Sequence, residues 1–254
     1  MLRKLAALAV VTLVAAPAQA QAQAQAQDLD EVLSNYYEAI GGLDAWQSVQ
    51  SIKMTGKMMM GGMGIEAPFT VMAKRPNMAR IEFVFQGMTG VQGYDGETAW
   101  QVMPFAGSTE PEEIPEGQAE DLWETADVDG PLVGWEESGH TVELLGMEET
   151  AGTQAYKLKI TMNSGSVQYY YLDSEYFVPI KMEGVREVQG RTVEFETIVS
   201  DYKEVGGLMI AHSIEARPKG APAGQAVTID VVELNVEMAD SLFVMPEKSE
   251  EGQQ

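Results

Sequence analysis

The feature that most constrains this fold is an alternation of apolar and polar side chains with a period of two. Between Ile65 and Ala73 every odd position is apolar. Glu66, Thr70 and Lys74 fall on the opposite face. Successive side chains of a β-strand point to opposite faces, so this pattern predicts a strand with one buried face.

The same alternation returns along most of the chain, and turn-forming residues separate the runs. Asp95-Gly96, for example, is a strong hairpin signal. The runs predict strands at residues 52–60, 65–74, 79–86, 91–94, 98–103, 141–145, 155–161, 167–172, 178–182, 192–202, 208–215 and 226–236. Because no helices are interleaved between these runs, we predict a mainly β fold of about eleven antiparallel strands in a barrel or a strongly curled sheet.

One helix is predicted before the first strand. Asp28 is suited to cap its start, and Gly41-Gly42 is suited to end it. Such a helix packs its apolar side on the sheet. The apolar residues that recur there at helical spacing are Leu29, Val32, Leu33, Tyr36, Ala39 and Ile40.

The N-terminus predicts an exported protein. Arg3 and Lys4 precede a short apolar run that ends near Ala18-Gln19-Ala20. This is the layout of a secretory signal peptide that is cleaved after residue 20. We therefore assign residues 1–20 to a signal peptide, 21–27 to a flexible low-complexity linker, 28–247 to one folded domain and 248–254 to a disordered acidic tail.

Charge and composition exclude several kinds of partner and site. The formal net charge is −23 at pH 7, and such a surface repels nucleic-acid backbones and anionic membranes. We therefore expect no nucleic-acid partner and no stable binding to a membrane surface. The chain has no cysteine, which excludes disulfides, thiolate metal sites and cysteine nucleophiles.

The sequence also lacks the motifs of common catalytic sites. His140 and His212 are the only histidines, and neither belongs to a metal-binding pattern such as HExxH. No nucleophile elbow, phosphate-binding loop or dinucleotide fingerprint follows a predicted strand. We therefore predict that the protein is not an enzyme and has no catalytic residue, metal or cofactor. Both histidines are interpreted as structural.

Residues 106–136 interrupt the strand pattern. The segment is acidic and contains prolines, and its second half is amphipathic. Loops of this length in compact domains are usually functional or disordered. We predict that this segment forms short helices that make a lid over the barrel, with apolar contacts from Leu122, Trp123, Leu132, Val133 and Trp135. The alternative is that the segment plugs the barrel permanently as part of the core.

The apolar strand faces are rich in methionine, of which the chain has 16. Methionine is flexible and polarisable, so such a lining suits ligands of variable shape. The alternative is a solid core in which the same residues pack against one another. We predict an apolar cavity lined by Met54, Met58, Phe69, Val71, Ile81, Phe83, Phe85 and Trp100.

Two motifs stand in order near the ends of these predicted strands. Lys74-Arg75-Pro76-Asn77 ends one strand, and Tyr94-Asp95-Gly96-Glu97-Thr98-Ala99-Trp100 forms a later hairpin, which Pro104-Phe105 follows. This arrangement resembles the LolA family of periplasmic lipoprotein carriers. The resemblance implies an incomplete antiparallel β-barrel that is closed by an N-terminal helix and a helical lid. It also implies an apolar cavity for acyl chains and a periplasmic location.

The resemblance assigns a role to Arg75. In the family, the arginine of the first motif hydrogen-bonds to the lid and helps the carrier to switch between closed and open states. We therefore expect Arg75 to be a lid latch, with carbonyls or a carboxylate between Gly117 and Gly130 as its partners. The alternative is a solvated arginine that caps the end of the strand.

The function implied by the resemblance is transport of the acyl chains of lipoproteins or other lipids towards the outer membrane. Such a carrier is expected to be a monomer that meets donor and acceptor proteins at the membranes. The alternative is a lipid- or peptide-sensing regulatory module of the cell envelope. The two hypotheses differ in whether the apolar face is free for a lipid.

Overall fold

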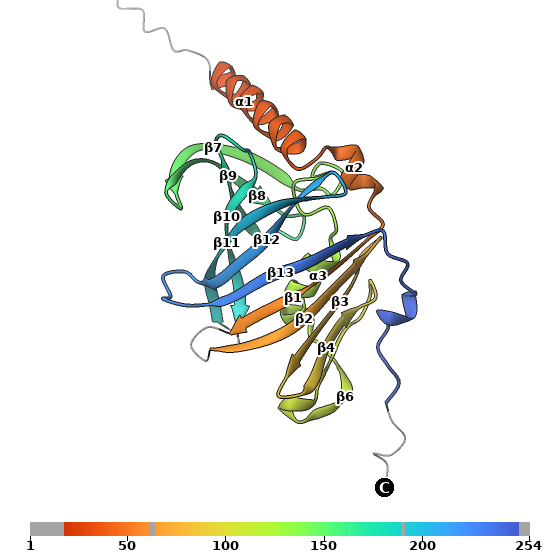
Figure 1. The fold of residues 1–254 in the computed structure, drawn as a ribbon. Helices are drawn as coiled ribbons and strands as arrows, with labels where there is room; N and C mark the ends of the chain where they lie inside the picture. The colour runs from red at the N-terminus through yellow and green to blue at the C-terminus, as the bar shows by residue number, and fades with distance from the viewer. Residues whose placement is uncertain (1–17, 61–63, 189–190, 249–254) are drawn as a thin grey trace, which may run out of the picture.

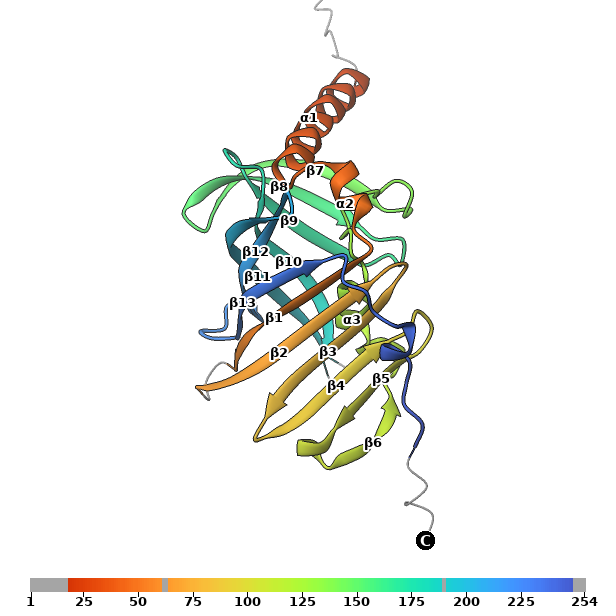
Figure 2. The same ribbon diagram turned by 45° about the vertical axis from the view of Figure 1, so that its right-hand side comes forward.

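The centre of the protein is one strongly curled antiparallel sheet. The computed structural model describes residues 18–60, 64–188 and 191–248. Within these ranges the sheet has 13 strands in the order β6-β5-β4-β3-β2-β1-β13-β12-β11-β10-β9-β8-β7. Figures 1 and 2 show that it wraps around the side on which α3 lies. The described strands of the sheet end at β6 and β7, which do not pair, so the barrel is incomplete, and the predicted fold class is confirmed.

The elements have the following bounds. The helices are α1 (Ala18–Ala39), α2 (Leu43–Ser48) and α3 (Glu120–Ala126), with short 3-10 helices η1 (Pro104–Ala106), η2 (Glu116–Gln118) and η3 (Asp240–Leu242). The strands are β1 (Ser51–Met60), β2 (Ile65–Lys74), β3 (Met78–Phe85), β4 (Met88–Tyr94), β5 (Ala99–Met103), β6 (Ser108–Glu113), β7 (Thr141–Thr150), β8 (Thr153–Thr161), β9 (Val167–Asp173), β10 (Pro179–Val188), β11 (Arg191–Val205), β12 (Leu208–Pro218) and β13 (Gln225–Leu234).

The strand that the sequence did not predict is β6, which lies inside the acidic segment. Its sequence is Ser-Thr-Glu-Pro-Glu-Glu, so no alternation of apolar residues marks it. A strand at the edge of a sheet tolerates charge and proline, because only one of its sides is paired. Each of the twelve predicted runs corresponds to one of the other strands, so the predicted total of about eleven was too low.

Helix α1 begins well before Asp28, the residue predicted to cap it. It runs through residues 21–27, which we predicted to be a flexible linker. The difference has a local cause, because alanine and glutamine both favour the helix. Residues 1–17 of the predicted signal peptide and 249–254 of the predicted tail lie outside the described residues.

Helix α1 packs its apolar side on the β7–β9 end of the sheet. Val32, Leu33 and Tyr36 are buried there with Leu158 and Leu172. This is the amphipathic helix that the spacing of the apolar residues predicted. No helix within the described ranges is long and apolar enough to span a membrane.

The pairing of β1 with β13 joins the beginning and the end of the domain. Ile52 faces Leu234 across this pair, and β2 pairs with the other side of β1. We call the side of the sheet on which α3 lies the inner face and the opposite side the outer face. Around Ala79 and Ala99 both faces of the sheet are covered, the inner face by α3 and the outer face by the segment after β13.

We call this segment, residues 235–243, the C-terminal strap. Side chains of β1, β2, β3 and β5 each donate a hydrogen bond to one of its carbonyls. These bonds are Ser51 Oγ to Val236 O (2.6 Å), Lys74 Nζ to Met238 O (2.7 Å), Arg80 NH1 to Leu242 O (2.8 Å) and Trp100 Nε1 to Phe243 O (2.7 Å). The strap thus serves as a cover for the outer face and buries Phe243 completely.

The turn after α1 requires glycine at residue 41. Gly41 has φ 106°, and a Cβ there would lie 2.2 Å from the carbonyl oxygen of Gly207. Gly42 has φ 95° but nothing within 4 Å of its Cβ position. We expect Gly41→Ala to lower the free energy of unfolding by about 3 kcal/mol and Gly42→Ala by about 1 kcal/mol, because only the first adds a backbone clash to the strain. Urea denaturation measures both, and equal losses would contradict the role of this close approach.

Candidate functional site

The candidate site is the apolar inner face of β1–β3. The strand register places Met54 opposite Val71, and Val71 opposite Ile81. Phe69 and Phe83 form the next pair towards the hairpin ends. By the same register Met58 and Phe85 belong to this face. Seven of the eight residues predicted to line a cavity therefore share one surface.

Most of this surface is only half-buried. Phe69 is buried, but the other residues retain part of their surface. The half-buried ones are Met54, Met58, Val71, Ile81, Phe83 and Phe85. A solid core buries such residues fully. The inner face therefore keeps an apolar surface from which a ligand can displace water.

Trp100 is the exception, and its predicted place in the cavity was wrong. Ala99 packs on the inner face with Ala79 and Leu122, so its neighbour Trp100 points to the outer face. There it is fully buried, and its Nε1 donates to the carbonyl of Phe243 in the strap. Gly93 lies under the ring, which a Cβ would approach to 2.4 Å.

Helix α3 covers the inner face near Ala79 and Ala99. Leu122 and Ala126 are 2% and 1% exposed and pack on these two alanines. On its other side, Glu124 accepts a hydrogen bond of 2.7 Å from Nε2 of Gln168 in β9. The helix therefore lies between β3 and β9, across the inside of the curled sheet, as Figure 2 shows.

The other residues predicted for the lid have different surroundings. Trp123 is 41% exposed. Leu132 and Val133 are buried against α1 and β8, and Trp135 packs on the same cluster. The hydroxyl of Tyr37 donates to the carbonyl of Leu132 at 2.9 Å. The segment therefore divides into a short cover, α3, and a part built into the core beside α1.

Arg75 joins this divided segment to the sheet. Its NH1 and NH2 donate to the two carboxylate oxygens of Asp129 at 2.5 and 2.6 Å. Nε donates to the carbonyl of Val49 at 2.6 Å, and NH2 also donates to that of Trp46 at 3.2 Å. Planar, paired bonds of this kind are the strong form of an arginine–carboxylate contact.

The contact is partly shielded from water. The side chains of Arg75 and Asp129 are 23% and 22% exposed. The hydrogen bond to Asp129 raises the pKa of Arg75 above its usual value. Asp129 lies between Gly117 and Gly130, the range in which we expected a partner for Arg75. The two carbonyls that Arg75 also contacts, those of Val49 and Trp46, lie outside this range.

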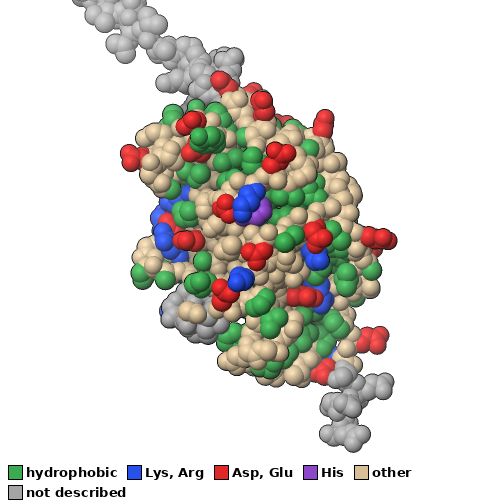
Figure 3. Space-filling model, viewed as in Figure 1, with side chains coloured by type: hydrophobic (Ala, Val, Ile, Leu, Met, Phe, Trp, Pro, Cys, Tyr) green, Lys and Arg blue, Asp and Glu red, His purple; other side chains and the backbone are tan. Residues whose placement is uncertain are grey.

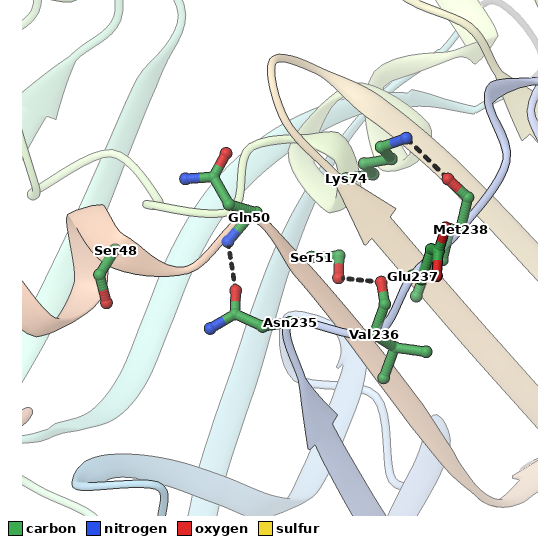
Figure 4. A pocket seen from close by; sticks show the side chains of 8 residues that line it. All are labelled: Ser48, Gln50, Ser51, Lys74, Asn235, Val236, Glu237 and Met238. Atoms are coloured by element: carbon green, nitrogen blue, oxygen red, sulfur yellow. Dashed lines mark hydrogen bonds between the residues drawn. The ribbon is translucent and has the colours of Figure 1, made fainter.

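A hollow lies on the surface near the end of β2. It is lined by Ser48, Gln50, Ser51, Lys74, Asn235, Val236, Glu237 and Met238. Figure 4 shows the hydrogen bonds that cross it, including that from the backbone nitrogen of Gln50 to Oδ1 of Asn235 at 2.7 Å. Its polar groups bind the strap to the ends of β1 and β2. We interpret it as part of the attachment of the strap.

The acidic side chains do not gather into a patch on the face of the molecule seen in Figure 3. On the side seen in Figure 3, acidic side chains are scattered among apolar and uncharged ones. Further round the sheet, basic residues face acidic ones, as in Lys181 with Glu183 at 2.6 Å and Arg217 with Glu196 at 2.7 Å. These contacts balance charge locally.

The histidines have structural contacts. His212 is 4% exposed, and its Nδ1 lies 2.9 Å from the carbonyl of Ile210. Nδ1 of His140 accepts a bond of 3.1 Å from the backbone nitrogen of Asn163. Among the described residues no group of three or more His, Cys, Asp or Glu side chains is placed to hold a metal ion.

Sequence reasoning missed three residues of this site. Asp129 was one of many acidic residues in its segment, and no local pattern distinguished it. Gln168 alternates correctly for the inner face, but a lone polar residue gives no sign of its partner on α3. Phe105 was noted only as part of a motif, and it lies against Phe83 and Phe85 with ring centroids 5.5 Å apart in each pair.

The geometry defines the class of protein, an open antiparallel half-barrel with a helix laid across its apolar inside. Within that class the fold is LolA-like, as predicted. The chain is similar to a crystal structure of a LolA superfamily protein from Nitrosomonas europaea, with a TM-score of 0.57 and 15% identity over 85% of this chain and 96% of that one.

Two further crystal structures share the fold. A putative outer membrane lipoprotein-sorting protein domain from Vibrio parahaemolyticus has a TM-score of 0.56 and 13% identity, over 84% of this chain and 94% of that one. A DUF1329 family protein from Desulfovibrio piger has a TM-score of 0.59 and 16% identity, over 84% and 97%. No family model and no curated protein matches the sequence significantly. The likeness is therefore one of fold.

Proposed function

We propose that this protein is a carrier that binds the acyl chains of lipoproteins or other lipids between the inner face and α3. The observation that supports the proposal most is the half-buried apolar surface of β1–β3 under a single short helix. An acyl chain needs a long apolar surface and few polar contacts. The inner face offers such a surface from Met54 to Phe85.

The free energy of burying an acyl chain explains why a carrier needs a cover that competes with its ligand. Burial of a chain contributes about 0.8 kcal/mol per methylene, so a long chain binds tightly unless something opposes it. Leu122 and Ala126 occupy the inner face in the structure and compete with a ligand for it. In this proposal Arg75 acts as the latch, and its bonds to Asp129 set the balance between the covered and the open state.

The carrier is proposed to work in the periplasm, as a monomer that is exported by its signal peptide. Its cargo passes from a donor to an acceptor at the outer membrane. The shared fold with a putative outer membrane lipoprotein-sorting domain is consistent with this role. The chemistry of the inner face requires no catalytic group for binding and release.

Native mass spectrometry tests the proposal. The protein is purified from the periplasm without detergent, and its adducts are identified after lipid extraction. Adducts with the mass of acylated molecules are expected. A clean mass that persists after exposure to lipids and acylated peptides would contradict a carrier and favour the regulatory binding module.

A substitution at the centre of the inner face provides a second measurement. Val71 lies between Met54 and Ile81 in the register, so Val71→Gln places an amide against the bound chain. We expect about tenfold weaker binding of a fluorescent fatty acid, because an unpaired buried polar group costs at least about 1 kcal/mol. Val231→Gln is the control, since Val231 is 50% exposed. Equal affinities of the two variants would place the ligand elsewhere.

A further inference from the structure

Three phenylalanines meet on the inner face at the end of β3 that lies away from Ala79, on which α3 packs. Phe83 and Phe85 belong to β3, near its hairpin with β4. Phe105 comes from η1, the turn between β5 and β6. Its ring centroid is 5.5 Å from that of each of the other two rings, and the pair with Phe85 is edge-on. All three are half-buried.

The position of Phe105 is built into the strands beneath it. Gly90 pairs with Phe83 across β3 and β4, so a side chain at residue 90 would point to the inner face. A Cβ there would lie 2.7 Å from Cε1 of Phe105 and 3.0 Å from Cζ of Phe83. The absence of a side chain at Gly90 therefore provides the space that the ring of Phe105 fills.

The three phenylalanines lie at a defined distance from α3. Ile81 packs on the buried residues beneath α3, and Phe85 follows four residues later on the same strand. At about 3.3 Å per residue, the two are separated by roughly 13 Å along the inner face. An extended chain that enters beneath α3 and follows β3 therefore meets the edge of the Phe105 ring.

We propose that Phe105 determines the length of the acyl chain that the inner face accepts, because its ring closes the end of the apolar surface on the seat provided by Gly90. This inference rests on the proposed carrier function. It concerns specificity, and it makes Phe105 a contact of the last methylenes of the chain. A chain that ends before the ring gains from each added methylene, and one that reaches the ring gains nothing further.

A series of straight-chain saturated fatty acids of increasing length tests the inference. Each acid competes with a fluorescent fatty acid for the full-length mature protein. For the unsubstituted protein, affinity is expected to rise roughly fourfold per methylene, the equivalent of about 0.8 kcal/mol, and then to stop rising at a limiting length. Phe105→Ala is expected to move that limit to longer chains, and Phe105→Trp to shorter ones.

Phe177→Ala is the matched control. Phe177 is also half-buried and also has an aromatic partner, since its ring stacks on that of Tyr156 with centroids 5.6 Å apart. It lies in the turn between β9 and β10 and is expected to leave the limit unchanged. Circular dichroism and thermal melting verify that each variant is folded. If Phe105→Ala does not fold, Phe105→Trp still tests the inference.

The outcomes separate the two proposals. If fatty acids bind and the limit moves in opposite directions in the two Phe105 variants, the inference is supported. If they bind with the same limit in all folded variants, the inference is overturned and the carrier function stands. If neither the fluorescent fatty acid nor any acid of the series binds to any folded variant, the carrier function itself is overturned.

Discussion

Replacing Arg75 by leucine is expected to release the segment around Asp129 and to open the inner face. The substitution removes two bonds to Asp129 and two to backbone carbonyls, of Val49 and Trp46. It leaves a partly buried carboxylate without its cation. The loss of such a pair is costly because the remaining charge is no longer compensated. We expect the free energy of unfolding to fall by about 2 kcal/mol.

Hydrogen exchange identifies where this loss acts. In Arg75→Leu, amides of residues 120–130 are expected to exchange at least about tenfold faster, while those of β8 remain protected. An apolar dye is expected to bind more strongly, because α3 no longer occupies the inner face.

Arg217→Leu is the matched control. Arg217 also bonds to a carboxylate on the outer face, that of Glu196 at 2.7 Å, but it is 33% exposed, and Glu196 has a second cation in Lys181, whose Nζ lies 3.7 Å away. The substitution is expected to cost no more than about 1 kcal/mol and to leave residues 120–130 unchanged. A double-mutant cycle with Asp129→Asn assigns the energy to the pair. Unchanged exchange in Arg75→Leu would rule out the latch.

The alternation in the sequence shows, for a physical reason, which side of the sheet Arg75 faces. Ala73 and Arg75 share the parity of a buried face, and an arginine on such a face requires a partner. The identity of Asp129 was not predictable, because it lies 54 residues away in a segment with many carboxylates. Local pattern fixes which side a residue faces, whereas the pairing depends on how the segment returns across the sheet.

The error at Trp100 has a different origin. Alternation was interpreted with one buried face and one solvated face, yet around Trp100 the sheet is covered on both. Met72 and Met78 on the outer face are buried at 9% and 8% exposure, with Phe243 of the strap packed on them. The strap lies more than 140 residues from Trp100 in sequence, so it leaves no mark on the alternation around Trp100. Trp100 was therefore assigned to the inner face, although it lies on the outer one.

Local pattern also could not predict that the lid segment divides into α3 and a part packed beside α1. Leu122 and Leu132 have similar surroundings in sequence, both amphipathic and both in the acidic segment. Only the path of the chain separates them, since Leu122 lies on Ala79 and Ala99 whereas Leu132 lies on α1. Apolar spacing therefore predicted that both are buried but not which surface buries each.

Phe243→Ala is expected to be the most destabilising substitution in the strap. The side chain is fully buried between Met72, Met78 and Met238, so its removal leaves a cavity beneath the strap. Truncation of a buried phenylalanine costs about 3–5 kcal/mol. Because Phe243 is the most deeply buried side chain of the strap, we expect residues 235–243 to detach as a unit once this anchor is lost.

Limited proteolysis and hydrogen exchange measure the detachment. Residues 235–243 are expected to become cleavable and to lose protection, whereas residues 120–126 keep theirs, because α3 lies on the opposite face of the sheet. Leu242→Ala is the control, since Leu242 is adjacent but 41% exposed, and its truncation is expected to cost less than about 1 kcal/mol. Equal losses in the two variants would mean that the backbone hydrogen bonds hold the strap and that Phe243 does not anchor it. A loss of protection in α3 as well would show that the two faces of the sheet open together, which their separate contacts do not predict.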